Sequence, residues 1–320
     1  MLSRRKFFYV SAGAALAAAP AMTSKERVDR ALRGQDVDRT PFTLWHHFGL
    51  ERFPGERHAR ATLEFHRKFR TDLVKVMSDY PYPKPAGKWH QTKVLDNPFP
   101  AQLDALAMIR DGLKGEAYFL ETIFNPWNQA TKISSKEEVL RLMREDPKTL
   151  LATLDAIAES EANHATKAIA AGAAGIFLAI DNAQNGYLTR EEYAKFSEPF
   201  DKRILERISS APLNTLHLHG DKVYVDYFLK GWPASVVNYA NMETGVSIAT
   251  VRKQYSGALM SGLEFDNYRK LSEADLKRQY ESARTAAGRK FILAPGCSVP
   301  NDSTDTELSR LARIVGASAA

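Results

Sequence analysis

Gly175-Ile-Phe-Leu-Ala-Ile-Asp181 and Asn214-Thr-Leu-His-Leu-His-Gly220 are two short apolar runs separated by a helical pattern over residues 190–208. This order is typical of two parallel strands joined by a helix. Six further runs have strand character and are followed by turn residues and helical stretches: residues 41–47, 72–78, 118–124, 235–241, 257–263 and 290–296. Eight such units predict an α/β fold, a (β/α)8 TIM barrel that forms a single domain.

The intervening helical patterns cover residues 56–69, 147–171, 190–208, 272–287 and 302–315. An open, doubly wound sheet is the alternative arrangement of such units, but no glycine-rich phosphate-binding sequence follows any of the runs. The 320 residues are 44% hydrophobic and 26% charged, which excludes disordered and fibrous classes. A proline-rich stretch, residues 80–100, is predicted to be a long loop that lies over the barrel mouth and shapes the substrate site.

The N-terminus is typical of an export signal. Ser3-Arg4-Arg5-Lys6-Phe7-Phe8 is a twin-arginine motif, residues 7–19 are an apolar Ala/Gly-rich core, and Ala19-Pro-Ala21 is a small-residue cleavage site. We therefore predict a signal peptide at residues 1–21, a barrel domain at residues 22–320, and a periplasmic or extracellular protein. A membrane anchor is the alternative, but the apolar run is shorter than the ~20 residues that span a bilayer.

The charge of the chain gives no reason to expect a nucleic-acid partner. The net charge of +6 includes Arg4, Arg5 and Lys6, and residues 1–21 hold no acid. The rest of the chain has 41 basic and 38 acidic side chains, a net charge of +3. This balance does not imply a nucleic-acid partner, and we predict none.

The sequence 214–220 carries two histidines one residue apart. Because strand side chains alternate, His217 and His219 point to one face, opposite Leu216 and Leu218. Cys297, the only cysteine, follows the last strand run and cannot form an internal disulfide. Two imidazoles and one thiolate are the ligand set of a catalytic zinc site that keeps one position open. The alternative to a metal site is that the two histidines make only local hydrogen bonds and that the thiol is buried and inert.

Active sites of such barrels lie where the strands end. The polar residues predicted there are His46, His47, Ser78, Asp79, Asn125, Asp181, Asn182, His217, His219, Asn238, Asn241, Glu264 and Cys297. Adjacent strand residues face opposite ways, so we interpret His46 as a substrate contact and His47 as structural. Asp79 is interpreted as a base or a cation binder, with a turn-stabilising cap as the alternative. His46 and Asp79 are therefore the candidate catalytic residues.

The chain resembles the uroporphyrinogen decarboxylase superfamily, which includes the decarboxylase itself and cobalamin-dependent methyltransferases that move methyl groups from a corrinoid to a thiol. The likeness covers nearly all of residues 23–315. Its markers are Lys25-Glu-Arg-Val-Asp-Arg-Ala-Leu-Arg-Gly-Gln-Asp-Val-Asp-Arg-Thr-Pro41, Ser78-Asp79, Pro126-Trp127, Thr189-Arg-Glu-Glu-Tyr-Ala-Lys-Phe196, Leu216-His-Leu-His-Gly-Asp221 and Ala294-Pro-Gly-Cys-Ser-Val-Pro300. The resemblance implies a (β/α)8 barrel, in agreement with the strand count.

The chain departs from the decarboxylase at its substrate-binding motifs. The decarboxylase has Arg-Gln-Ala-Gly-Arg after its first strand, with arginines that clamp substrate carboxylates, whereas this chain has His46-His-Phe-Gly-Leu50. The decarboxylase's tyrosine falls on Lys132, its serine near Asn182 and its late histidine on Cys297. Among the decarboxylase's site residues, only its aspartate has a match in this chain, at Asp79. The resemblance therefore does not favour decarboxylation of uroporphyrinogen.

The methyltransferase branch is closer. It has a His-x-Cys pattern followed by a distant Gly-Cys, and this chain has His217-Leu-His219 and Gly296-Cys297. Replacement of a thiolate by a neutral imidazole leaves the bound metal more electrophilic, which favours activation of water or another divalent metal.

These patterns predict an exported, zinc-dependent enzyme for methyl (one-carbon) transfer or demethylation through a metal-activated thiol or water. Its substrate is predicted to be a small molecule, with a corrinoid as a candidate co-substrate. Two alternatives stay open. One is decarboxylation of a uroporphyrinogen-like tetrapyrrole, and the other is a non-catalytic periplasmic barrel that binds a small ligand or a corrinoid.

Overall fold

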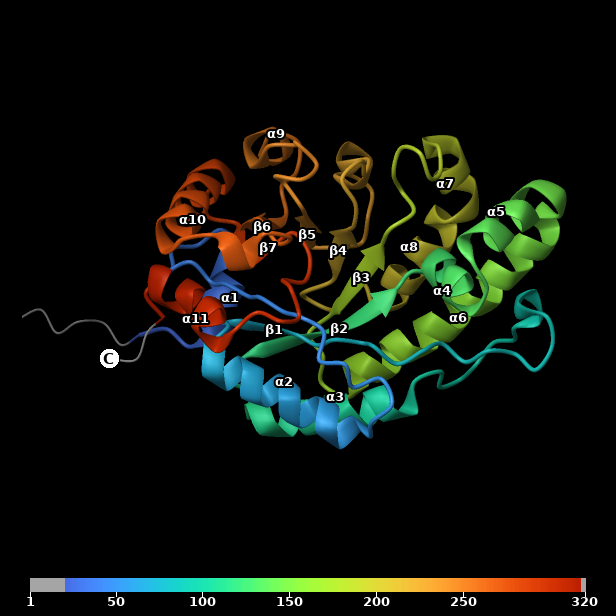
Figure 1. Cartoon of the computed structure of the whole chain (residues 1–320), viewed down its shortest axis with the longest axis horizontal. Helices are drawn as coiled ribbons and strands as arrows, with labels where there is room; N and C mark the ends of the chain where they lie inside the picture. The colour runs from blue at the N-terminus through green and yellow to red at the C-terminus, as the bar shows by residue number, and fades with distance from the viewer. Residues whose placement is uncertain (1–20, 318–320) are drawn as a thin grey trace, which may run out of the picture.

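The computed structural model describes residues 21–317, so the predicted signal peptide lies outside the described residues apart from Ala21. Seven parallel strands form one curled sheet in chain order (Figure 1). They are β1 (Leu73–Lys75), β2 (Tyr118–Phe124), β3 (Ile176–Ile180), β4 (Thr215–Leu218), β5 (Val236–Tyr239), β6 (Ala258–Leu263) and β7 (Phe291–Pro295). Each lies within one of the eight predicted runs. The prediction of a parallel, barrel-type α/β domain is confirmed.

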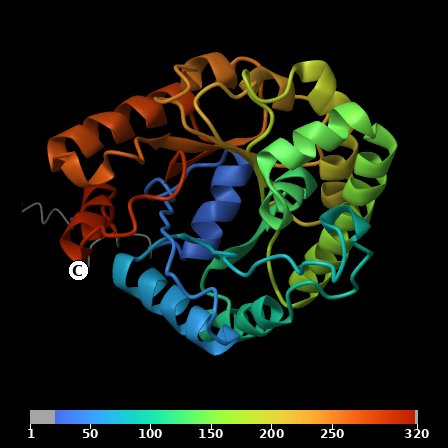
Figure 2. The same cartoon turned by 45° about the vertical axis from the view of Figure 1, so that its right-hand side comes forward.

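Helices surround the curled sheet (Figure 2). The α-helices are α1 (Ser24–Arg33), α2 (Gly55–Phe69), α3 (Pro100–Leu113), α4 (Pro126–Ile133), α5 (Lys136–Glu145), α6 (Pro147–Ala170), α7 (Arg190–Phe196), α8 (Glu198–Arg207), α9 (Ile248–Arg252), α10 (Glu273–Ala287) and α11 (Asp305–Ile314). Short 3-10 helices are η1 (Trp89–Gln91), η2 (Val225–Phe228) and η3 (Tyr268–Lys270). No helix in the described part of the chain is both long enough and apolar enough to cross a bilayer.

The first predicted strand, residues 41–47, does not form a strand of the sheet. It makes a single parallel bridge between Phe42 and Leu293 of β7. On its other side, Asp72 N donates to Phe42 O over 2.8 Å and Thr43 Oγ1 donates to Leu73 O over 2.7 Å. This short extended segment therefore links β7 to β1. Regular strand pairing ends before the two histidines, but the side chains still alternate: Leu44 packs under the helices and Trp45 packs in the barrel interior.

Strand side chains alternate between the barrel interior and the layer beneath the helices. Leu216 and Leu218 of β4 pack in the core cluster under the helices. The alternation turns His217 into the interior, where its ring stacks on Phe177 of β3 with centroids 4.7 Å apart. The same geometry directs His219, which follows the strand, to the interior side.

Helix α1 closes the end of the barrel opposite the site, and it lies within the ring of helices in Figure 2. Val28 packs with Leu73 in the interior core cluster. Arg27 is buried and pairs with Asp38 over 2.7 Å and with Asp72 over 2.6 Å. The opening segment that carries part of the family resemblance thus seals the N-terminal end of the strands.

Two sequence expectations are wrong in detail. The helical pattern at residues 190–208 forms two helices, because Pro199 lacks the N–H that a continuous helix needs and the chain breaks at Ser197. The loop at residues 80–100 does not shape the cavity described below, since none of its residues lines it. It lies along α6, where Leu95 N donates to Ser160 Oγ over 2.8 Å and Thr153 Oγ1 donates to His90 O over 3.0 Å.

Candidate metal and substrate site

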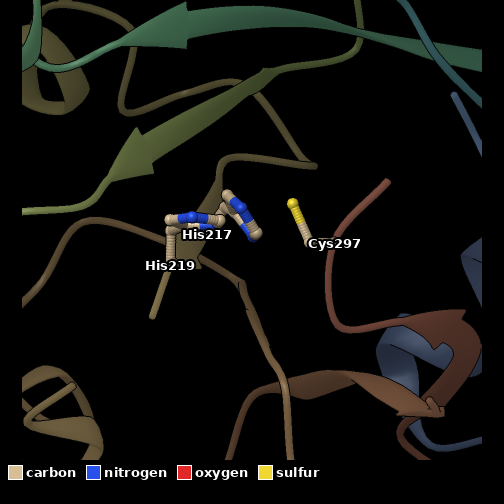
Figure 3. A group of neighbouring side chains, drawn as sticks. All are labelled: His217, His219 and Cys297. Atoms are coloured by element: carbon tan, nitrogen blue, oxygen red, sulfur yellow. The ribbon is translucent and has the colours of Figure 1, made fainter. Parts of the chain in front are cut away.

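Three donor side chains from distant parts of the sequence meet in the barrel. His217 lies in β4, His219 follows that strand, and Cys297 lies in the loop after β7. Their ligand atoms all lie within 4.8 Å of one another, and Figure 3 shows the thiol beside the two imidazoles. Atoms bound to one zinc at about 2.0–2.3 Å stand closer than this, so small side-chain shifts would bring the three to one ion.

His217 presents a fixed ring nitrogen to this cluster. Its Nδ1 lies 2.6 Å from Asn238 Oδ1. The Asn238 amide nitrogen donates to Met260 O over 2.7 Å and to Pro295 O over 3.1 Å, so Asn238 Oδ1 must be the acceptor. His217 therefore carries its proton on Nδ1, and Nε2 is free to bind a ligand.

Close backbone packing brings Cys297 to the cluster. A Cβ at Gly296 would stand 2.4 Å from Ala240 Cα, so only glycine lets the loop after β7 pass here. Burial opposes ionisation of the Cys297 thiol, but hydrogen bonds and charge from His217 and His219 outweigh it and hold the thiol pKa well below its usual value. In turn, the hydrogen bond to Cys297 raises the pKa of His219. The lowered pKa of Cys297 favours the thiolate, which is the form that binds metal.

The cluster opens onto a cavity of about 240 Å³ inside the barrel. Its lining is Trp45, His47, Lys75, Met77, Thr122, Phe124, Asn128, Phe177, Ala179, Asp181, His217, His219, Cys297 and Ser298. The volume lies below the ~300–1,000 Å³ of pockets for drug-sized ligands. The cavity thus suits a small molecule bound next to the three donors.

The structure places His47, rather than His46, at the cavity. His47 Nδ1 lies 2.6 Å from Asp79 Oδ1, and the Asp79 side chain is only 6% exposed. His46 packs against the rings of Phe48 and Phe65 at 5.1 and 5.2 Å, and it does not line the cavity. The two-residue alternation continues through this segment, with Trp45 and His47 at the cavity and Leu44 and His46 toward the helices, so the inward histidine is the one that we interpreted as structural. The catalytic roles of Asp79 and His46 stay predictions.

Most other polar residues at the strand ends serve the structure. Asn125 Nδ2 donates to Asn182 Oδ1 over 2.8 Å and to Asp201 Oδ2 over 3.1 Å in a buried network. Asn241 Oδ1 accepts from Ser261 Oγ over 3.0 Å. None of these residues lines the cavity, and neither do Ser78 and Glu264. Topology alone therefore overstates the number of site residues.

Two further charged residues line the cavity. Asp181 Oδ2 accepts from Asn128 Nδ2 over 2.6 Å, and burial raises the pKa of Asp181. Lys75, the last residue of β1, is 8% exposed. Sequence reasoning missed Lys75 because it lies in the middle of the predicted run 72–78, and only residues at the ends of the runs were considered. The available signal was a lysine at an inward position of the apolar run Leu73-Val-Lys-Val-Met77.

The sequence profile of the uroporphyrinogen decarboxylase (URO-D) family matches residues 79–317, more than half of the chain. The chain belongs to this family. The match includes Asp79 and the three donor residues, whereas the opening segment at residues 25–41 lies outside it. The family resemblance seen in the sequence is thereby confirmed.

Curated relatives of this URO-D protein match over part of their length. Uroporphyrinogen decarboxylase from Shewanella pealeana is 32% identical over 133 residues, 40% of this chain and 35% of that protein. The enzyme from Thioalkalivibrio sulfidiphilus is 33% identical over 134 residues, 40% of this chain and 36% of that protein. The alignments thus span about a third of the length of these relatives.

Solved structures with the same fold include methyl-transfer enzymes. A methyltransferase from Methanosarcina mazei has a TM-score of 0.72 at 16% identity and covers 92% of this chain and 99% of its own. A B12-independent methionine synthase from Shewanella sp. W3-18-1 has a TM-score of 0.57 at 11% identity, and the match covers 87% of this chain and 93% of the synthase chain. At these identities the likeness establishes the fold of the URO-D protein and no more.

Proposed function

We propose that this URO-D protein is a zinc-dependent enzyme for methyl (one-carbon) transfer or demethylation of a small molecule. The observation that carries the proposal is the convergence of His217, His219 and Cys297 within 4.8 Å beside a cavity. Three protein ligands beside an open space are the arrangement of a catalytic zinc site, which lowers the pKa of a bound thiol or water.

Other residues would hold the substrate and move its proton. His47 faces the cavity with Nδ1 bound to the Asp79 carboxylate, which leaves Nε2 to take a proton from a thiol or water. Asp79 acts through His47, as a positioning residue. The faces of Trp45 and Phe177 line the cavity and exclude water. A corrinoid is too large for about 240 Å³, so a corrinoid co-substrate would deliver its methyl group from outside the cavity.

Metal analysis of the purified protein tests the proposal. We expect about one zinc per chain in the parent and in a His90→Ala control, because His90 lies away from the site on η1. His217→Ala, His219→Ala and Cys297→Ala should each lose most of the metal. Metal-free parent protein from a zinc-supplemented culture, or full zinc content in Cys297→Ala, would contradict the proposal.

The two alternatives have less support. No arginine lines the cavity, and Asp79 is already paired with His47, so the carboxylate clamp expected for a uroporphyrinogen-like substrate is missing there. Loss of CO2 from uroporphyrinogen would favour decarboxylation. A non-catalytic binding barrel would be favoured if the zinc-loaded protein retained a ligand but formed no methylated or demethylated product from methylcobalamin and small thiols.

Export by the twin-arginine route to the periplasm or beyond is part of the proposal. It rests on Ser3-Arg4-Arg5-Lys6-Phe7-Phe8 and the cleavage site Ala19-Pro-Ala21. Cell fractionation of the full chain, compared with an Arg4→Lys, Arg5→Lys variant, tests it. We expect the parent in the periplasmic fraction with an N-terminus near Met22 and the variant in the cytoplasm.

A further inference from the structure

Lys75 is a buried cation inside the cavity. It is the last residue of β1 and is 8% exposed. Its Nζ contacts Met77 Sδ at 3.0 Å and lies 5.6 and 5.1 Å from the ring centroids of Trp45 and Phe177. A thioether and two aromatic faces stabilise a cation weakly, so the ammonium lacks a full partner within the protein.

The negatively charged groups nearest in effect to Lys75 are Cys297, Asp79 and Glu121, and each interacts with other side chains. Cys297 interacts with His217 and His219, and Asp79 Oδ2 is buried with no hydrogen-bond partner in residues 21–317. Asp79 Oδ1 is bonded to His47, and the two oxygens of Glu121 are bonded to Gln102 and His164 over 2.8 Å each. Among the described residues, no carboxylate oxygen lies within 4.0 Å of Lys75 Nζ to form an ion pair. Lys75 therefore differs from the buried Arg27, which pairs with two carboxylates.

A buried charge is stable only when it is paired, and an unpaired one costs several kcal/mol. Burial lowers the pKa of Lys75 to about 8, so the group is still mostly protonated at neutral pH. The lysine lines the same cavity as the three metal donors. The missing partner is thus a group that a ligand can bring into the cavity.

We propose that Lys75 binds the carboxylate of a small ligand, which lies in the cavity between Lys75 and the cluster of His217, His219 and Cys297. A carboxylate fits better than a phosphate, because one ammonium matches one negative charge and no arginine lines the cavity to hold a dianion. If the proposed function is added, the substrate is a small carboxylate whose reacting end faces the donor cluster. This identification of the substrate rests on the proposed function.

The test uses metal-free protein, so that it does not depend on zinc. Tryptophan fluorescence, which reports on Trp45 beside Lys75, is recorded during titration with propionate and with propionamide, its neutral analogue. We expect propionate to bind about 10- to 100-fold more tightly than propionamide, the range for a hydrogen bond to a charged group. Lys75→Met and Lys75→Gln should abolish the preference, and the exposed Lys253→Met should keep it.

The inference would be overturned if the two compounds bound equally well, or if propionate showed no saturable binding at millimolar concentration. It would also be overturned if both Lys75 variants kept the preference for propionate. Urea unfolding of each variant shows whether it is folded. Two different replacements of Lys75 are used because either new side chain could itself fill the space that propionate would occupy. A protein that prefers propionate but takes up no zinc would support the carboxylate site and refute the proposed metal chemistry. The two proposals can therefore fail separately.

Discussion

Asn238 Oδ1 accepts the proton of His217 Nδ1 across 2.6 Å, and the Asn238 amide nitrogen spans from β5 to carbonyls of β6 and β7. One buried amide therefore sets both the tautomer of a donor histidine and the position of the strand that precedes Cys297. Such partners of metal ligands contribute to metal affinity although they do not touch the metal.

Asn238→Ala should weaken zinc binding about 10- to 100-fold, the usual effect of losing the partner of a metal-bound histidine. Asn238→Asp retains an acceptor for His217 and should lose less affinity. Competition with a chromogenic chelator measures both affinities, and urea unfolding separates a loss of metal from a loss of fold. Equal zinc affinity in the parent and Asn238→Ala would refute the role of this hydrogen bond.

The metal-free protein should have a reactive thiol at neutral pH. The two imidazoles outweigh burial and lower the pKa of Cys297, so the thiolate persists at pH values well below its usual range. Alkylation by iodoacetamide, followed across pH, should reach half its maximal rate well below the midpoint for free cysteine. His219→Ala should move the midpoint upward, and zinc should protect the thiol. A midpoint equal to that of free cysteine would contradict this assignment.

His47→Gln and Asp79→Asn should each lower kcat for methyl transfer by about 100-fold, within the range for general acid–base catalysis. The double variant should be little worse than either single variant, because Asp79 acts through His47. Zinc content should stay at the parental level in all three. Multiplicative losses in the double variant would show that the two residues act independently.

Arg27→Ala should destabilise the barrel by about 3–5 kcal/mol, because it leaves Asp72 buried with its charge only partly compensated. Arg60→Ala is the matched control. Arg60 forms an exposed i,i+4 pair with Glu56, and such pairs contribute about 0.3–0.5 kcal/mol. Urea unfolding at pH 7 measures both values. Similar small losses would mean that α1 does not seal the barrel through Arg27.

Lys75 should make stability depend on pH. Its pKa falls from 10.5 to about 8 on folding, so the unfolded chain binds more protons between these values. Stability from this group therefore rises with pH from about 8 to 10.5, by about 3 kcal/mol. Lys75→Met should remove this rise and be at least as stable as the parent at pH 7. The difference between the two urea-unfolding free energies, measured from pH 7 to 10.5, isolates the effect from other titrating groups.

The candidate site was only partly predictable from local patterns. His217 and His219 were placed correctly on one face because a two-residue alternation is a property of any extended strand. The same rule also holds for His46 and His47, since Leu44 and His46 face the helices whereas Trp45 and His47 line the cavity. The local pattern did not show which of the two histidines faces inward. Lys75 was missed because it lies inside a predicted strand run rather than at its end, and the run does not show whether the lysine has a partner in another strand.

The sequence by itself determined the parallel strands, the helices between them and the common face of His217 and His219, because these follow from backbone periodicity and side-chain polarity over a few residues. Only the tertiary structure decided that Cys297 meets the two imidazoles, that Asp79 holds His47, and that Lys75 lacks an acidic partner. These contacts depend on the curl of the sheet, which brings the ends of β4 and β7 together across the barrel interior.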